Sequence, residues 1–353
     1  MHDVSDESKR PEMRSETSLS PTPRRRRYAA QVPAEGTGGV FTESWFPICP
    51  AWEVRVGQVL GKSFLDGRVV VYRGEDGVAH VQSAWCPHVG ADLAVGAVVG
   101  NHLRCAFHHW EFASDGSCVR TGIGDPPPAN ACLFRFPCVE KFGLIWAFNG
   151  ASPWWDIPDF PVPEHDLAID VRYDVPVMPV DPWVVCANTP DWQHIKVVHR
   201  LDFDSTDLFE RIEWTKHSMR YAFSGRMEHG TGPEIEYNVG VYGTSIFHLH
   251  GTLNGMWYAV MTAFGMPSPG VTQNYFVLCV RKGDGSPESD AQIRMTHDFL
   301  FQLGKQMTND DRPILHNIRY TPGTLTRADR ALARYLELVR QFPRSHVSED
   351  FIK

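Results

Sequence analysis

Two short segments of the sequence each combine a cysteine with a histidine. Cys86 and His88 form a Cys-x-His segment, and Cys105 and His108 form a Cys-x-x-His segment after a gap of sixteen residues. Two thiolates and two imidazoles suit a metal site, and tetrahedral zinc is the first candidate. Zinc sites of this composition usually keep one ligand type within each segment, whereas both segments here mix the two types. The spacing therefore favours a two-metal cluster to which each segment gives one ligand of each type.

The order of these residues resembles the Rieske [2Fe-2S] motif over both of its halves. In such a cluster one iron takes two cysteines and the other takes two histidines. The segments Cys-Pro-His (86–88) and Cys-Ala-Phe-His (105–108), followed by Trp110, match this pattern. The resemblance implies that Cys86, His88, Cys105 and His108 hold the cluster.

Position 109 departs from that pattern. It is His where the family usually has Gly, so His108 and His109 compete for the ligand role on sequence alone, and the spacing favours His108. As a neighbour of the cluster, His109 can tune its potential through hydrogen bonding or charge.

A second group of potential ligands lies between Asn188 and His199. Asp191 precedes His194 by three residues, and His199 follows His194 by five. On a helix, a spacing of five brings two histidines only loosely to one face. Two histidines and a carboxylate with open positions form the ligand set of non-heme Fe(II) oxygen chemistry. By itself this spacing suits two structural histidines equally well, and Asn188 is equally well explained as a helix cap.

Placed after a Rieske motif, the Asp-x2-His-x4-His pattern resembles the catalytic domain of the Rieske non-heme iron oxygenases. It is nearer the single-component ketosteroid hydroxylase and O-demethylase type than the two-subunit dioxygenases. The resemblance covers about residues 41–345. It implies a helix-grip catalytic domain, in which a curved antiparallel sheet wraps a long helix and the pocket sits above the iron.

The third iron ligand of this family comes from a late helix. Residues 306–320, QMTNDDRPILHNIRY, supply that segment. Asp311 fits best because the Asp-x-Pro-Ile that it begins is typical of single-component relatives. Asp310 is the alternative, His316 is a weaker one, and both acids also suit a helix cap. The resemblance implies that His194, His199 and Asp311 hold a mononuclear Fe(II).

The resemblance gives Asp191 a separate role. In the family, an acid at this position bridges a cluster histidine of one subunit to an iron histidine of the next, which implies a ring of subunits, normally a homotrimer. A carboxylate between two imidazoles fixes their tautomers and links their protonation to redox state. Asn188 is then expected to border the iron.

The implied function is that of an enzyme, the terminal oxygenase component of a multi-component system. It would use O2 and electrons to hydroxylate or demethylate a hydrophobic aromatic or polycyclic substrate. Electrons would come from NAD(P)H through a separate reductase or ferredoxin, since the chain has no G-x-G-x-x-G fingerprint. Desaturation and cis-dihydroxylation are alternatives within the family. A pure Rieske electron carrier, which would need only residues 41–150, is the alternative outside it.

Residues 237–265 are expected to supply an apolar pocket wall, because they are rich in Tyr, Phe, Met and Trp. His248 and His250 alternate by two and so face one side of a strand together. They are candidate substrate contacts.

The secondary-structure elements that we expect around these residues indicate an α+β chain. Residues 1–40 read as a disordered leader, residues 41–150 as an all-β domain carrying the cluster on two loops, and residues 151–353 as the catalytic domain. In the last part we expect a helix after Pro190, strands from about 212 to 282, and helices around 289–309 and 326–342.

Composition limits the remaining classes. A net charge of −8 argues against a general nucleic-acid binder, and no apolar run reaches the roughly 18 residues of a membrane span. Iron–sulfur clusters are assembled in reducing compartments, so a cytoplasmic location is expected. Six further cysteines are expected to be buried free thiols: Cys49, Cys118, Cys132, Cys138, Cys186 and Cys279.

Overall fold

Three small antiparallel sheets build the N-terminal part of the chain. The structure, a computed structural model, describes residues 31–203, 208–320 and 323–353. The first sheet has the order β10-β11-β2, the second β3-β4-β5 and the third β6-β7-β8-β9. Their strands are β2 (Trp45–Pro50), β3 (Val59–Phe64), β4 (Gly67–Arg73), β5 (Ala79–Ser83), β6 (Ala97–Val99), β7 (His102–Arg104), β8 (Glu111–Phe112), β9 (Cys118–Arg120), β10 (Cys138–Lys141) and β11 (Leu144–Phe148).

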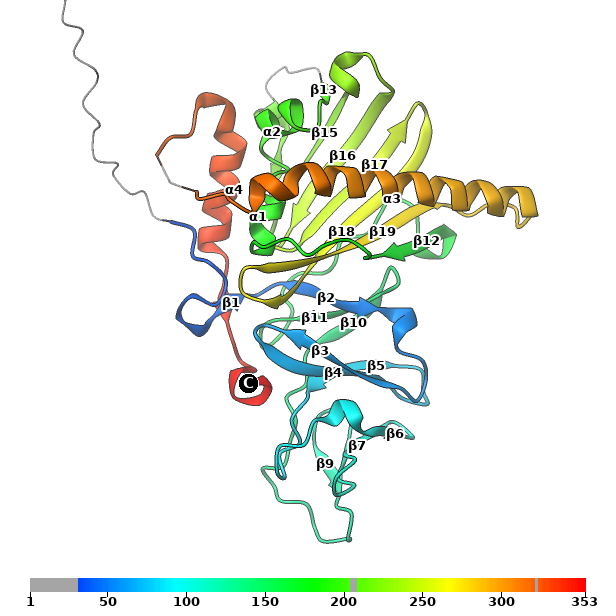
Figure 1. Cartoon of the computed structure of the whole chain (residues 1–353), viewed down its shortest axis with the longest axis vertical. Coiled ribbons are helices and arrows are strands. Elements are labelled where there is room, and N and C mark those ends of the chain that lie inside the picture. Colours follow the sequence, from blue (N-terminus) through cyan, green and yellow to red (C-terminus); the bar gives the residue numbers. More distant parts are fainter. Residues whose placement is uncertain (1–30, 204–207, 321–322) are drawn as a thin grey trace, which may run out of the picture.

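The third sheet lies at the end of the molecule farthest from the large C-terminal sheet (Figure 1). One cysteine–histidine segment follows β5, and the other connects β7 to β8. Both segments are therefore loops, as expected, and both belong to this distal end.

One eight-stranded antiparallel sheet dominates the C-terminal part. Its order is β12-β19-β18-β17-β16-β15-β13, with β14 also paired to β15. The strands are β12 (Leu167–Arg172), β13 (Asp202–Phe203), β14 (Glu213–Trp214), β15 (Ser218–Arg226), β16 (Glu234–Tyr242), β17 (Ile246–Leu253), β18 (Met256–Ser268) and β19 (Val271–Arg281). The hairpin order of β15 to β19 follows from their short turns, since antiparallel neighbours need only a few connecting residues.

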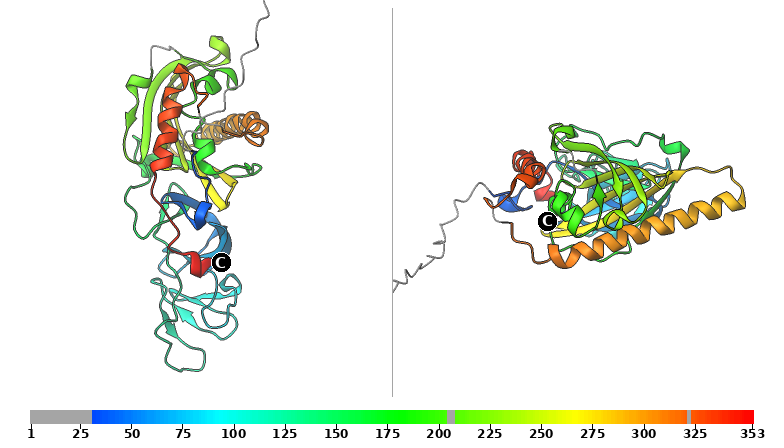
Figure 2. Two further views of the ribbon diagram at one scale, coloured as in Figure 1. Left: turned by 90° about the vertical axis from the view of Figure 1, so that its left-hand side faces the viewer. Right: turned by 90° about the horizontal axis from the view of Figure 1, so that it is seen from above.

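Helix α3 (Pro287–Leu315) lies across this sheet, as two views show (Figures 1 and 2). Ser286 caps its first turn by accepting from the backbone N–H of Ser289 at 3.1 Å. The helix continues past the expected end near residue 309, through Pro313, to Leu315. Proline in the last turn removes few helical hydrogen bonds, and Asp311 therefore sits on the helix itself.

Three further helices lie around the sheet in the described C-terminal part. They are α1 (Pro182–Cys186), α2 (Trp192–Val197) and α4 (Arg330–Gln341). Buried α4 side chains such as Tyr335 share a core with Trp183 of α1, and the two helices lie side by side (Figure 1). This arrangement of a curved sheet with a long helix across it confirms the predicted α+β class, an all-β domain followed by a helix-grip domain.

The two faces of the large sheet bury different partners. On β19, Phe276 and Leu278 belong to the core that includes Leu300 and Phe301 of α3. Val277 and Cys279, on the opposite face, pack with N-terminal side chains that include Trp45, Leu144, Trp146 and Phe148. Alternate residues of a strand point to opposite faces, so one strand serves both the helix and the N-terminal domain.

Both ends of the described chain tie the two parts together. The first 30 residues of the expected leader lie outside the described residues, and in the remaining ten Val32 and Glu35 are buried. Glu35 is buried, and its carboxylate accepts hydrogen bonds from the backbone N–H and the hydroxyl of Thr42, both at 2.9 Å. At the other end, β20 (Arg344–Ser345) pairs with β1 (Phe41–Thr42), and α5 (Glu349–Ile352) buries Ile352 in the N-terminal core. The C-terminal segment thus returns to the cluster domain.

All eight cysteines are free, but they are not uniformly buried. Cys49, Cys186 and Cys279 are buried, and burial raises the pKa of the Cys49 thiol to about 12. The expectation of a buried thiol was wrong for Cys132, which is exposed in a loop, while Cys118 and Cys138 are half-buried. Among the described helices, none is both long and apolar enough to cross a bilayer.

Candidate metal centres

The two cysteine–histidine loops converge. The imidazole rings of His88 and His108 lie 4.6 Å apart between centroids, at 72° to each other. Trp110 stacks on His88 with centroids 4.4 Å apart and ring planes 10° apart. Cys86 and Cys105 are buried, and the thiol of Cys105 faces that of Cys86 closely enough to affect its pKa. The structure therefore brings the four predicted cluster residues together.

The site formed by these four side chains has a buried side and an exposed side. Both cysteines are at most 2% exposed, whereas His88 and His108 are exposed at the tip. Burial raises the pKa of Cys86 to about 12, and the neighbouring Cys105 acts in the same direction. Two buried thiols side by side suit a bound cation, which replaces their protons. The buried thiols and the exposed imidazoles together fit the two-cysteine, two-histidine donor set that would hold a Rieske cluster.

The backbone around His108 is tightly constrained. His109 has φ +52°, the left-handed region in which glycine has no steric penalty. Its ring has no described aromatic partner, while that of His108 meets His88. Gly122 approaches the same loop so closely that a Cβ there would lie 2.0 Å from the His108 carbonyl oxygen.

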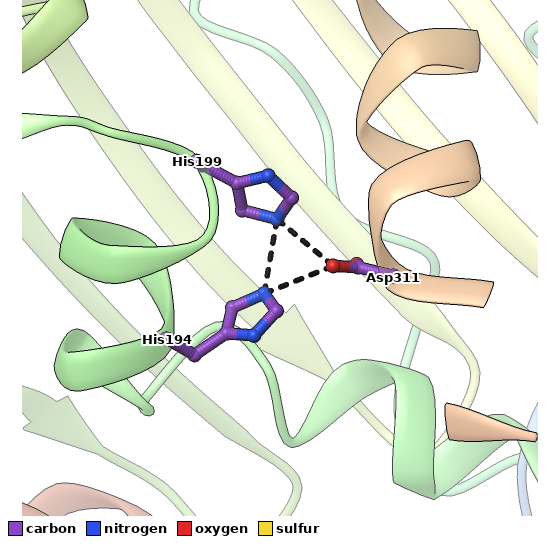
Figure 3. A group of neighbouring side chains, drawn as sticks. All are labelled: His194, His199 and Asp311. Atoms are coloured by element: carbon purple, nitrogen blue, oxygen red, sulfur yellow. Dashed lines mark hydrogen bonds and ion pairs between the residues drawn. The ribbon is translucent and has the colours of Figure 1, made fainter. Parts of the chain in front are cut away.

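Three side chains from distant segments meet beside α3. His194 lies on α2, His199 follows that helix, and Asp311 comes from the C-terminal end of α3 (Figure 3). The Nε2 atoms of the two histidines are 2.9 Å apart, and each is 3.2 Å from Oδ1 of Asp311. Helix α2 ends before His199, so the spacing of five residues does not have to obey helical geometry.

The separations fit one small cation. Metal–ligand distances of about 2.1 Å at right angles place neighbouring ligand atoms about 3.0 Å apart, and tetrahedral angles place them about 3.4 Å apart. The observed 2.9 and 3.2 Å lie nearer the right-angled value. His199 Nδ1 is also buried without a hydrogen-bond partner among the described residues, and the buried Asp311 Oδ1 faces the two imidazoles. Both the geometry and the donor set suit a facial 2-His-1-carboxylate site.

Asp311 is held as a carboxylate by its neighbours. Burial alone would raise its pKa, but hydrogen bonds and charge interactions with His194 and His199 outweigh burial and lower the pKa to about 2. Its second oxygen, Oδ2, accepts a hydrogen bond from Nδ2 of Asn188 at 2.9 Å. Asn188 therefore orients the carboxylate whose other oxygen faces the histidines.

The other predicted acids, Asp191 and Asp310, and the alternative ligand His316 lie apart from the triad. Asp191 is the N-cap of α2, where its Oδ1 accepts from the backbone N–H of His194 at 3.0 Å. Asp310 accepts from Nε2 of Gln306 at 2.8 Å on the exposed side of α3. His316 is exposed beyond the end of that helix. The side chains of Asp310 and Asp311 point in different directions because consecutive helical residues differ by about 100°.

An apolar cavity of about 210 Å³ adjoins the triad, between the sheet and α3. His194, His199 and Asp311 form part of its wall, together with Asn188 and Thr189. The other lining residues are mostly apolar or aromatic: Val185, Ile195, Leu201, Tyr221, Phe223, Met227, Tyr237, Val239, Phe247, Leu249, Tyr258, Val260, Thr262, Phe264, Asn274, Phe276, Leu300, Leu303, Gly304, Met307 and Thr308. No Lys, Arg or Glu belongs to the described lining, so the wall suits a neutral hydrophobic molecule.

His248 and His250, the candidate substrate contacts, are not among the residues that line this cavity. Phe247 and Leu249 line the cavity, so the histidines between and after them face the other side of β17. His248 is buried there and stacks on Phe160 with centroids 4.3 Å apart. The period of two was identified correctly, but the sequence did not indicate which face of the sheet α3 covers.

Sequence reasoning also missed Thr262, Asn274 and the α3 residues Gly304, Met307 and Thr308 as cavity residues. The pattern of Thr262 with Phe264, and of Asn274 with Phe276, was an available signal, since both pairs repeat at the strand period. The α3 residues became recognisable only when the helix was placed over the sheet.

Comparison with known proteins agrees with this architecture. The Rieske [2Fe-2S] domain family matches residues 44–136. Cholesterol 7-desaturase from Bombyx mori is 39% identical over 125 residues, which cover 34% of this chain and 28% of that protein. The oxygenase component of dicamba O-demethylase from Stenotrophomonas maltophilia is 34% identical over 166 residues, which cover 44% and 46%. The chain thus spans less than half the length of these curated relatives.

The fold extends the likeness beyond the first domain. A mutant of NdmA from Pseudomonas putida, solved with caffeine, superimposes with a TM-score of 0.67 at 19% identity, covering 85% of this chain and 90% of that one. Residues 44–136 match the Rieske [2Fe-2S] domain family, and the C-terminal part has the sheet-and-helix fold of the structural neighbours. The chain is therefore similar to Rieske non-heme iron oxygenases in the sequence of its first domain and in the fold of both domains.

Proposed function

We propose that this protein is the terminal oxygenase component of a Rieske non-heme iron oxygenase system, with a hydrophobic aromatic or polycyclic substrate. One observation carries the proposal: His194, His199 and Asp311 converge on the wall of an apolar cavity. A metal site that only stabilises the fold would not need an adjoining cavity.

The residues of the triad have separate tasks in this proposal. His194, His199 and Asp311 would hold Fe(II) at the face that they present to the cavity, and Asn188 orients the carboxylate through its 2.9 Å hydrogen bond. When bound, the iron supplies the reduction and activation of O2. The apolar side chains of the cavity exclude water and orient the substrate beside that face.

Cys86, His88, Cys105 and His108 hold the [2Fe-2S] cluster in this proposal. His88 and His108 are exposed, so a reductase or ferredoxin that carries electrons from NAD(P)H can reach the cluster edge. Each turnover combines one O2, one NAD(P)H and one proton with the substrate, and it yields hydroxylated product, water and NAD(P)+. Hydroxylation of an O-methyl carbon gives demethylation after loss of formaldehyde. Desaturation is the alternative outcome, for which the 39% identity to a desaturase is the supporting observation.

The cysteine–histidine loops belong to the end of the molecule farthest from the large sheet, whereas the triad comes from α2, the segment after it and α3, which lie beside that sheet (Figure 1). This separation favours electron transfer between subunits, and we therefore propose a homotrimer in which Asp191 links the α2 end of the iron site to a cluster histidine of the adjacent subunit. Its Oδ1 is engaged by the backbone of His194, which would fix the carboxylate in place. We also propose a cytoplasmic location, because cluster assembly requires reducing conditions.

The test is metal analysis of anaerobically purified protein, combined with an EPR spectrum after dithionite reduction. We expect about three irons and two acid-labile sulfides per chain and a Rieske-type signal. His199→Ala should retain two irons, both sulfides and the signal, and should lose substrate-dependent O2 uptake with a surrogate reductase. Full turnover and full iron content in that variant would refute the proposed site, and zinc without sulfide would refute the function as a whole.

A further inference from the structure

Most polar atoms of the cavity wall are already satisfied by protein partners. The hydroxyls of Tyr237 and Tyr258 hydrogen-bond to each other. The hydroxyl of Tyr221 donates to the carbonyl of Thr189 at 2.9 Å, and that of Thr308 donates within α3 at 3.0 Å. A ligand therefore gains little by reaching these groups.

Asn274 is different. Its side chain is on the cavity wall, the residue is 2% exposed, and its Oδ1 is buried without a partner among the described residues. A buried polar atom without a partner is costly and is usually satisfied by a group that the structure does not contain. Outside the triad, Asn274 Oδ1 is the only lining side-chain atom of the described residues with this property.

Thr262 adds a second polar group on the same face. In the β18–β19 pairing, Thr262 is opposite Phe276, and Phe264 is opposite Asn274. All four side chains line the cavity, so the two polar residues form one diagonal of a four-residue patch and the two phenylalanines form the other. The Thr262 hydroxyl can donate as well as accept.

The patch lies near the iron end of the cavity. Phe276 is opposite Gly304 of α3, where a Cβ would come within 2.9 Å of its ring. Four residues earlier on β19, Thr272 pairs with Met178, and the adjacent Val177 carbonyl accepts from Nε of Arg312. From Phe276 to Thr272 the strand advances about 13 Å, and from Gly304 to Arg312 the helix advances about 12 Å. The strand and the helix therefore cover nearly the same distance between these two contacts. Asn274 is therefore level with about residue 308, within about one helical turn of Asp311.

We propose that Asn274 and Thr262 form the anchor that selects a substrate with a neutral hydrogen-bond donor, a hydroxyl or an amide N–H, on an otherwise apolar ring system. The donor gives its hydrogen to Asn274 Oδ1, and a hydroxyl oxygen accepts from Thr262 in return. Because the anchor is near Asp311, it sets which part of the bound molecule faces the triad. This inference rests on the proposed function only in taking the cavity as the substrate site.

The test uses full-length holoenzyme and a matched pair of ligands. The first probe is 1-(2-naphthyl)ethanol, and the second is 2-isopropylnaphthalene, which has a methyl group in place of the hydroxyl. Their dissociation constants are measured by quenching of protein fluorescence. We expect the wild type to bind the alcohol about tenfold more tightly, which corresponds to about 1.4 kcal/mol. Asn274→Leu should reduce this preference to about twofold or less and leave the affinity for the hydrocarbon nearly unchanged. Thr262→Val should give a smaller reduction.

The variant His199→Ala tests whether the hydroxyl of the probe binds the anchor or the metal. This variant should keep the preference for the alcohol, because the anchor does not include the triad. Loss of the preference in His199→Ala, with its retention in Asn274→Leu, would show that the hydroxyl binds the metal and would overturn the proposal. Equal binding of both probes by the wild type, or binding of neither up to its solubility limit, would overturn it as well. Iron and sulfide contents test the oxygenase assignment independently, so the two failures are distinguishable.

Discussion

Removal of the Asn188 side-chain amide should weaken iron binding without disturbing the cluster. Nδ2 of Asn188 donates to Oδ2 of Asp311 at 2.9 Å, while Oδ1 of the same carboxylate faces the two histidines. In Asn188→Ala the backbone is retained, and the carboxylate loses the partner that fixes its rotation. The cavity wall is mostly apolar, so the replacement donor available to Oδ2 is a water molecule.

The size of this effect follows from the type of hydrogen bond. A hydrogen bond to a charged group contributes about 1.5–3 kcal/mol, which is about 10- to 150-fold in an equilibrium constant. Partners that orient metal ligands typically account for about 10- to 100-fold in metal affinity. We therefore expect the dissociation constant for Fe(II) to rise about 10- to 100-fold in Asn188→Ala.

The assay is anaerobic competition for Fe(II) against a chelator of known affinity, with acid-labile sulfide and the EPR signal measured on the same samples. Asn317→Ala is the matched control, because Asn317 donates to the Pro313 carbonyl at 3.2 Å on the exposed end of the same helix. It should bind iron like the wild type. A dissociation constant for Asn188→Ala within twofold of the wild-type value would refute the argument that Asn188 orients Asp311.

Three further predictions concern the cluster loop, the buried face of the sheet and the cavity. Gly122→Ala should lose most of its acid-labile sulfide, because the new Cβ would lie 2.0 Å from the backbone carbonyl oxygen of His108. Burial lowers the pKa of His248 to about 3, whereas the unfolded value is about 6.5, so the protein loses stability as the pH falls below about 6.5. Between pH 7.5 and 5 this histidine should cost about 2 kcal/mol of unfolding free energy. His248→Phe should remove that loss, as measured by urea denaturation at both pH values. Gly304→Ala should push the Phe276 ring, 2.9 Å from the new Cβ, into the cavity and raise KM more for bicyclic than for monocyclic substrates.

Each of these variants has a control on the chain. Gly124→Asn places a side chain in open space in a left-handed conformation that Asn tolerates, and it should keep its sulfide. His165→Gln changes a histidine whose side chain is 81% exposed, and it should keep the wild-type pH slope. Gln302→Ala alters an exposed position on α3 and should not change the ratio of KM values. A normal sulfide content in Gly122→Ala, an unchanged slope in His248→Phe or an unchanged ratio in Gly304→Ala would contradict the corresponding argument.

The sequence by itself was sufficient to predict the Rieske domain and the two loops that carry its cysteine–histidine segments. Cys86, His88, Cys105 and His108 are close along the chain, and their order was informative because each loop of a Rieske cluster contributes one cysteine and one histidine. The α+β class also followed from the sequence, because a run of hairpin strands and a long terminal helix have strong local signals.

Tertiary structure decided which residues share the second site and the cavity. His199 and Asp311 are 112 positions apart, and only the packing of α3 over the sheet brings their ligand atoms to 3.2 Å. The same packing selected Phe247 rather than His248, and Asn274 rather than Tyr275, as cavity residues. A strand specifies that alternate side chains point to opposite faces, but its local sequence does not specify what covers each face. That depends on long-range burial, here the helix on one side and the cluster domain on the other.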